Sequence, residues 1–271
     1  MLLENLDEQS YHQRPELSST GARRILDSPA RFRYWADHPE KPKTAFDVGS
    51  AAHAKILGVG AGVILYPDEH LTPSGNVSTK AATVEWEREQ RALGLIPIGR
   101  SDAHRIDRMA EAVLAEPEAR AILERVTGRE VTIIQEVDGV PVRARFDIFG
   151  DGEAADLKTG RDASPSGFNR SAAKWGYHIQ VRWYDDAHLA ETGSRLDQFP
   201  LIVVESSPPY LVAVHDLDFM YAEAAERKVA KARDLWRTCT ESGVWPSYGR
   251  TTLTAPSWVV YEDENEEIQI G

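Results

Sequence analysis

The sequence predicts an α/β protein in which a central sheet is flanked by helices within one domain. Two alternating segments over residues 129–149 predict a hairpin, more alternating segments follow it, and helical patterns lie before and after them. The chain has 271 residues, of which 42% are hydrophobic, so it can bury one large core or two small ones. No repeat or low-complexity tract interrupts this pattern.

The region before the hairpin predicts helices. Residues 17–39 begin with helix-capping residues and carry a broken helical pattern, and the break at Ser28-Pro29 predicts two short helices. Small and apolar residues around His53 predict a buried helix that ends at Gly58.

The other segments outside the sheet are predicted from their composition and from the periodicity of their hydrophobic residues. Residues 59–78 are rich in Gly, Pro, Asp and Ser, which predicts a long surface loop. Helices are expected near 79–93 and 101–125, and a long amphipathic helix over 218–243. The acidic end of the chain, within 250–271, reads as a loose tail.

The hairpin has a predictable register. Asp138-Gly139 is a strong two-residue turn sequence, and it fixes which residues face one another. The pairs expected on the mostly apolar face are Val131 with Phe146, Ile133 with Ala144, Gln135 with Val142 and Val137 with Val140. On the opposite face Glu130 falls directly across from Asp147, with β-carbons about 5 Å apart. The register therefore puts two carboxylates side by side.

The next strand, residues 153–159, adds two more charges. Its alternation places Asp156 and Lys158 on one face and Ala155 and Leu157 on the other. Further strands are expected at 198–207 and 210–217.

A helix is expected between these strands, over roughly 172–191. In it Tyr177, Gln180 and Tyr184 have spacings that put them on one side.

Composition narrows the classes of function. The formal net charge of −12 argues against a protein that coats nucleic acid by bulk attraction, and leaves room for a local basic groove. The single cysteine, Cys239, cannot form an internal disulfide or a four-cysteine metal centre, so any metal must sit on oxygen and nitrogen ligands. No apolar run approaches the ~20 residues of a membrane helix, and the first residues lack the pattern of a signal peptide. A cytosolic location without a membrane partner is expected.

Glu130, Asp147 and Asp156 supply the hard oxygen ligands that Mg²⁺ prefers. Lys158 would place its ammonium beside the metal-bound water, which suits phosphodiester hydrolysis. The alternative is a solvated face, since a D-x-K sequence in a strand is common. The hairpin argues against that alternative, because its register independently places Glu130 and Asp147 next to each other.

The same residues resemble a known superfamily. Asp147, eight further residues and then Asp156-Leu157-Lys158 resemble the PD-(D/E)XK nuclease motif, with Phe146 in place of its proline, which contributes no ligand. "WGYHIQVRWY" is similar to the helix that follows the motif in RecB-type and RecE-type members. "LSSTGARRILDSPARFRYW", "VGSAAHAKILG", "SSPPYLVAVHDLD" and "GVWPSY" extend the likeness to RecE-like exonucleases, the exodeoxyribonuclease VIII family, from about residue 17 to 249.

This resemblance implies a restriction-endonuclease-like fold, a mixed sheet flanked by helices with N-terminal helical additions. Residues 1–271 would form a single nuclease domain. Within it, 17–128 would be the mainly helical N-terminal part, 129–249 the nuclease core with the C-terminal helix, and 250–271 the tail.

The resemblance also implies roles for single residues. The metal ligands, for two Mg²⁺ or Mn²⁺ ions, would be His53, Glu130, Asp147, Asp156 and the carbonyl of Leu157. Lys158 would orient or activate the attacking water, and Gln180 and Tyr184 would steady Lys158 or the scissile phosphate. Without the resemblance, His53 reads as a buried core histidine and Tyr184 as a packing residue.

Basic residues near the motif are candidates for DNA contacts. They are Arg143, Arg145, Arg161 and Lys174. Scattered surface charges are the alternative interpretation.

The function implied by the resemblance is exonucleolytic digestion of linear double-stranded DNA from the 5′ end, which leaves 3′ single strands for recombination. Implied partners are DNA ends, a single-strand-annealing recombination protein and further copies of the chain in a trimeric or tetrameric ring. Such enzymes act in bacterial cells, commonly for phages or prophages. The alternatives are a RecB-like nuclease acting on single strands or flaps, and a non-catalytic protein that binds DNA ends or a recombination partner.

Overall fold

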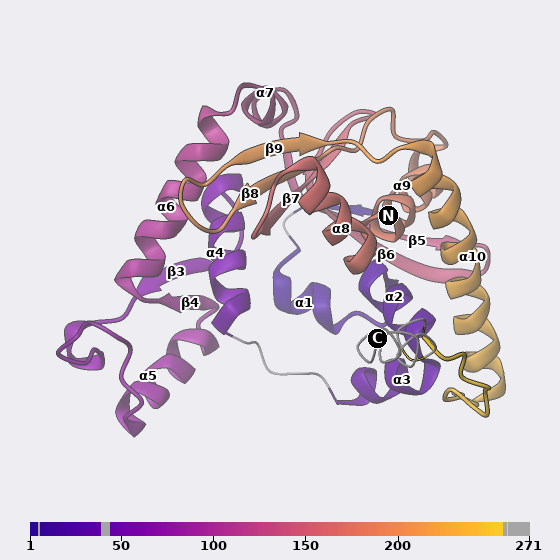
Figure 1. The fold of residues 1–271 in the computed structure, drawn as a ribbon, viewed down its shortest axis with the longest axis horizontal. Helices are drawn as coiled ribbons and strands as arrows, with labels where there is room; N and C mark the ends of the chain where they lie inside the picture. Colours follow the sequence, from indigo (N-terminus) through magenta and orange to yellow (C-terminus); the bar gives the residue numbers. More distant parts are fainter. Residues whose placement is uncertain (5, 39–43, 257–258, 260–271) are drawn as a thin grey trace, which may run out of the picture.

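The computed structural model describes residues 1–4, 6–38, 44–256 and 259. Within these residues a seven-stranded mixed sheet runs in the order β1-β5-β6-β7-β8-β9, and β2 pairs with β6 (Figure 1). Its strands are β1 (Leu2–Leu3), β2 (Leu17–Ser18), β5 (Gly128–Val137), β6 (Val140–Phe149), β7 (Ala154–Gly160), β8 (Leu201–Glu205) and β9 (Val212–His215). The β7–β8 and β2–β6 pairs are parallel and the other pairs are antiparallel. The predicted central mixed sheet is confirmed.

The hairpin of β5 and β6 has the predicted register. All four predicted pairs are present, from Val131–Phe146 to Val137–Val140. Asp138 and Gly139 have φ angles of 51° and 73°, and two positive φ values are what a two-residue hairpin turn requires.

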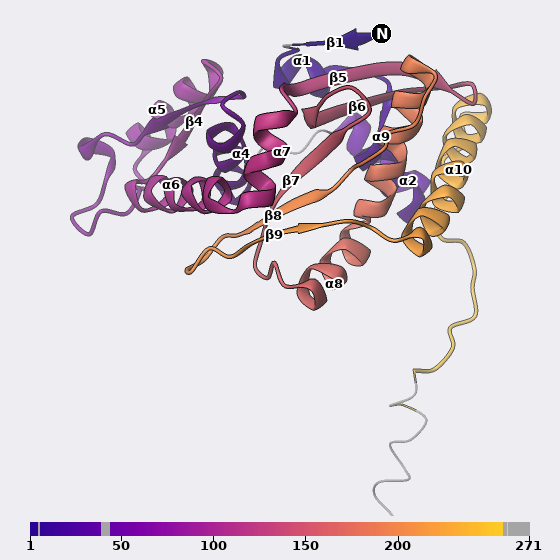
Figure 2. The same ribbon diagram turned by 90° about the horizontal axis from the view of Figure 1, so that it is seen from above.

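Helices cover both faces of the sheet. The helices in the described residues are α1 (Glu8–Gln13), α2 (Ser19–Asp27), α3 (Pro29–Asp37), α4 (Thr44–Leu57), α5 (Ala81–Ala92), α6 (Arg100–Ala115), α7 (Pro117–Arg125), α8 (Pro165–Trp175), α9 (Tyr177–Thr192) and α10 (Phe219–Ser242). Figure 2 shows α4, α6 and α7 on one side of β7 and β8, and α8 and α9 on the other.

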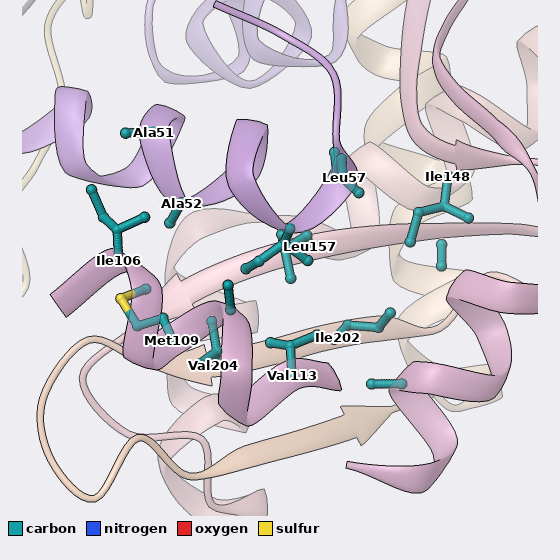
Figure 3. Close-up of a cluster of buried hydrophobic side chains, with 14 of the residues drawn as sticks. Ala51, Ala52, Leu57, Ile106, Met109, Val113, Ile148, Leu157, Ile202 and Val204 are labelled. Atoms are coloured by element: carbon teal, nitrogen blue, oxygen red, sulfur yellow. The ribbon is translucent and has the colours of Figure 1, made fainter. Parts of the chain in front are cut away.

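Buried apolar side chains form clusters on both sides of the sheet. Leu157 and Ile202 point into a cluster with Met109 and Val113 of α6, drawn in Figure 3. A second cluster joins β5 and β6 to α2, α9 and α10 around the fully buried Trp183.

Several elements differ from the prediction. The region 59–78 is not a continuous loop, because it contains β3 (Gly62–Leu65), which pairs in parallel with β4 (Leu95–Ile98), and a 3-10 turn at Asp68–His70. The helix expected over 101–125 is two helices, α6 and α7, since Pro117 starts a new helix at its first position.

The helix expected over 172–191 also differs. It is two helices, α8 and α9, separated by Gly176 in the left-handed region. Both the long C-terminal helix and the break at Ser28-Pro29 are as predicted. Most of the expected tail lies outside the described residues.

Across the described part of the chain, no helix has both the length and the apolar character needed to cross a bilayer.

Candidate active site

The candidate site lies where β6 and β7 separate. The two strands pair at Phe149–Ala154 and at Ile148–Ala155, and the ladder stops there. The next position along each strand is Asp147 on one and Asp156 on the other. At that point the carboxylate of Asp147 takes the place of a backbone acceptor, because its Oδ2 accepts a hydrogen bond from Leu157 N–H at 2.8 Å. The split in the sheet therefore brings the two aspartates together.

Asp156, Lys158 and Gln180 form a closed triangle. Asp156 is buried, and its Oδ2 forms an ion pair with the ammonium of Lys158. Gln180 of α9 bridges the two charges. Its Oε1 accepts from Lys158 Nζ at 3.0 Å, and its Nε2 donates to Asp156 Oδ1 at 2.5 Å. The predicted shared face of Asp156 and Lys158 is present, and Gln180 contacts Lys158 as the resemblance implied.

Burial and like charge control the protonation of this cluster. Burial, followed by repulsion from Asp156, raises the pKa of Asp147 well above its ordinary value. Burial alone would lower the pKa of Lys158, but the carboxylates of Asp156 and Asp147 outweigh it and raise that pKa. Lys158 is therefore a charged hydrogen-bond donor at neutral pH and not a free base.

His53 comes to the same place from α4. Its Nδ1 lies 3.5 Å from Asp147 Oδ2. Desolvation lowers the pKa of His53 to about 4, so the imidazole is neutral at neutral pH, and the neutral form is the one that coordinates metals. Of the two interpretations of His53, a core histidine and a site residue, the geometry favours the second.

Glu130 is held differently from the expectation. The pairs on either side of it keep the predicted register, so its backbone lies across from Asp147, with a φ of 51°. Its carboxylate, however, lies 3.4 Å from Arg145 Nε. Burial raises the pKa of Glu130, and Arg145 opposes that shift. Glu130 is thus near the site but paired with an arginine.

These contacts test whether the residues suit a divalent cation. Among the residues that the structure describes, no three His, Cys, Asp or Glu side chains form a ready metal cluster. The donor set nevertheless fits a hard cation, because Asp147 and Asp156 repel each other in a buried place and His53 is neutral beside them. A cation there would offset both the burial and the repulsion that raise the pKa of Asp147.

Tyr184 does not occupy its expected place. Its ring is buried in the core, with its centroid 4.9 Å from that of the Phe146 ring. In this structure the Tyr184 ring packs in the core and makes no contact with Lys158. Tyr177 contacts Lys158 instead, with its ring centroid 4.7 Å from Lys158 Nζ. Helical spacing placed both tyrosines on one side of the helix and could not separate these roles.

Arg143 and Arg145 are also placed differently from the prediction, because both lie under the N-terminal segment. Arg143 donates to the carbonyl of Arg14, and Arg145 donates to the carbonyl of Leu6. Both guanidiniums lie over the buried ring of Tyr11, at 5.0 and 4.5 Å from its centroid. With side chains this buried and already bonded, neither arginine offers a surface to a DNA phosphate in this structure.

The two other predicted DNA contacts are on the surface. Arg161 follows β7 and Lys174 lies in the last turn of α8, and both are exposed. One further basic residue, Arg23 of α2, was not indicated by any sequence pattern. Its Nη1 donates to the carbonyl of Trp175 at 2.6 Å, which ties α2 to the end of α8.

Comparisons with known proteins agree with this architecture. A search of curated proteins gave no match. Among solved structures, the chain is similar to a protein from Eubacterium rectale named "Putative exonuclease", with a TM-score of 0.60 and 12% sequence identity, over 95% of this chain and 96% of that one. At this identity the likeness establishes a shared fold. The family of PDDEXK-like domains of unknown function (DUF3799) matches residues 18–253. The chain, with its restriction-endonuclease-like mixed sheet, belongs to that PDDEXK-like family.

Proposed function

We propose that this protein is a divalent-cation-dependent exodeoxyribonuclease that digests linear double-stranded DNA from 5′ to 3′ and leaves 3′ single strands for recombination. The observation that carries the proposal is the placement of Asp147, Asp156 and Lys158 at the split between β6 and β7. Membership of a nuclease-like family supports hydrolysis. The name of the structural neighbour supports attack at DNA ends.

In this proposal the chain's own groups hold the scissile phosphate and the water. Asp147, Asp156, His53 and the carbonyl of Leu157 would hold Mg²⁺ or Mn²⁺, two ions per site, and Glu130 would join them after leaving Arg145. The bound ions supply charge for the attacking water and the phosphate. Lys158, kept charged and aimed by Gln180, donates a hydrogen bond to the negative charge that develops on the phosphate.

The proposed partners are DNA ends and a single-strand-annealing recombination protein in the bacterial cytoplasm, in a phage or prophage setting. A trimeric or tetrameric ring of this chain is also proposed, because a ring with a basic bore reconciles a net charge of −12 with DNA binding.

The test uses linear duplex labelled at the 5′ or the 3′ end and a closed circular duplex, each with Mg²⁺. We expect early release of the 5′ label as mononucleotides and no cleavage of the circle. Release that begins at the 3′ label would contradict the polarity. Cleavage of circles or of single strands alone would favour a RecB-like nuclease.

A substitution separates catalysis from binding. Lys158→Ala should lower the hydrolysis rate by about a hundredfold or more, because it removes a charged donor at the phosphate, while binding of duplex persists. The matched control is Lys231→Ala, since Lys231 is an exposed lysine of α10. A wild-type protein that binds DNA ends and never hydrolyses them would be the non-catalytic alternative.

A further inference from the structure

An exposed tryptophan ends α8, two residues before Tyr177, whose ring contacts Lys158. Trp175 is 56% exposed, unlike the fully buried Trp183. The ammonium of its neighbour Lys174 lies 5.1 Å from the centroid of the Trp175 ring. A large aromatic ring in solvent, with a cation beside it, is a combination that stacks on nucleic-acid bases.

The backbone below this ring is fixed. The carbonyl of Trp175 accepts a hydrogen bond from Arg23, whose other terminal nitrogen donates to Thr20 Oγ1 at 2.9 Å. Gly176 then turns the chain with a φ of 67°, and a Cβ at that position would lie 3.0 Å from Arg23 Cδ. The ring is therefore exposed on a rigid support, which lowers the entropy that a stacking partner must lose on binding.

The support connects directly to the candidate site. Tyr177, on the other side of Gly176, lies over the ammonium of Lys158. Burial lowers the pKa of Arg23, and the negative charge of Asp156 is among the groups that oppose this shift. Tyr177 and Trp175 thus flank Gly176, with the ring of Tyr177 over Lys158 and the ring of Trp175 in solvent.

The local charge suits a polyanion. In a chain with a net charge of −12, α2 and α8 together carry four cations and one acid. The cations are Arg23, Arg24, Arg170 and Lys174, and the acid is Asp27. Asp27 is paired with Arg31 of α3 at 3.0 Å, and Arg170 lies 3.9 Å from Asp162. Of these cations, Arg23 bonds to the Trp175 carbonyl and Lys174 lies over its ring, so two positive charges adjoin this residue and suit a phosphate.

We infer that Trp175 is a stacking platform for an unpaired base of the DNA strand whose phosphate lies at Lys158. This inference rests on the proposed nuclease function and specifies its substrate as a strand with unstacked bases next to the scissile phosphate. Lys174 contacts the phosphate that belongs to the stacked base. Duplex ends with a frayed or single-stranded tip bind better than blunt, stable ends.

The test measures binding without divalent cation, by fluorescence anisotropy, of a duplex with a short unpaired end and of the same duplex with abasic sites in that end. The wild-type protein should bind the abasic form about 5- to 100-fold more weakly, the range expected for one stacked base. Trp175→Ala should bind both forms equally, and Trp175→Phe should restore part of the difference. The matched control is Tyr248→Ala, because Tyr248 is a 60% exposed ring with Arg31 at 5.4 Å from its centroid.

The stacking role is overturned if the wild-type protein does not distinguish the two DNA forms. It is also overturned if Trp175→Ala keeps the wild-type difference. Hydrolysis of the duplex by the wild-type protein with Mg²⁺ is measured in parallel and tests the proposed function separately. Base-dependent binding without any hydrolysis would support the platform and reject the nuclease, whereas hydrolysis with equal rates for wild type and Trp175→Ala on both DNA forms would reject the platform alone.

Discussion

The carboxylate of Asp147 lies 2.8 Å from the backbone nitrogen of Leu157, the residue between Asp156 and Lys158. This bond ties the first charge of the motif to the strand that carries the other two. It forms because the β6–β7 ladder ends at the Ile148–Ala155 pair, which leaves the Leu157 N–H without a neighbouring strand on that side. The geometry of the charges is thus a consequence of how the sheet separates.

Gln180 is predicted to act as a positioning residue for Lys158. Gln180→Leu removes both hydrogen bonds of the amide, so the hydrolysis rate should fall by about 10- to 100-fold. The unfolding free energy should fall by about 1–3 kcal/mol, since Asp156 Oδ1 loses a buried partner. Chemical denaturation and rate measurements check both values. Gln198→Leu, at an exposed glutamine, should change neither.

The two aspartates should differ in a cation-free stability measurement. Asp147→Asn removes buried like charge and keeps an acceptor for Leu157, so it should raise the melting temperature. Asp156→Asn leaves the Lys158 ammonium without its anion and should lower the melting temperature. Mg²⁺ at about 100 times its Kd should stabilise the wild-type protein by about 2.7 kcal/mol and both variants by less. Equal stabilisation of all three proteins would place the cation elsewhere.

The same reasoning gives a pH dependence without cation. The folded-state pKa of Asp147 is raised, so its contribution to stability is present at low pH and is lost as the pH rises through that pKa. The wild-type protein should therefore lose stability relative to Asp147→Asn as the pH rises above the ordinary aspartate range. Parallel stability curves for the two proteins would show that Asp147 does not titrate abnormally.

Tyr11 is predicted to hold the N-terminal segment on the sheet. Its ring is 7% exposed and lies under the guanidiniums of Arg143 and Arg145. Tyr11→Ala should cost about 3–5 kcal/mol of unfolding free energy, as expected for loss of a buried aromatic ring. Tyr34→Ala, at a ring that is 61% exposed, should have a much smaller effect. If Tyr11→Ala lowered the unfolding free energy no more than Tyr34→Ala does, packing of the N-terminal segment through Tyr11 would contribute little to stability.

Gly176 is predicted to tolerate no side chain. Gly176→Ala combines a left-handed φ of 67° with a contact at 3.0 Å from Arg23 Cδ. Gly193 provides a matched control, because it has a φ of 83° at the end of α9 and open space around its Cβ position. Both alanine variants should lose about 1–2 kcal/mol from backbone strain, and only Gly176→Ala should lose more. Thermal unfolding of the pair isolates the Arg23 contact.

Much of the sheet was predictable because its rules are local. The turn at Asp138-Gly139 fixes the register of β5 and β6, and alternation fixes the shared face of Asp156 and Lys158. Capping and proline rules located the break at Ser28-Pro29. The short strands β1, β2, β3 and β4 escaped prediction, since strands this short are formed by pairing with distant segments and have little pattern of their own.

The candidate site was likewise predictable in part from the sequence. Sequence alone determined which residue types could serve hydrolysis, because spacing along a strand or helix decides which side chains share a face. Only the tertiary structure decided that Tyr177 contacts Lys158 while Tyr184 packs in the core. It also decided that the guanidiniums of Arg143 and Arg145 lie over the ring of Tyr11. Those outcomes depend on contacts between segments far apart in the chain, and periodicity within one segment carries no information about them.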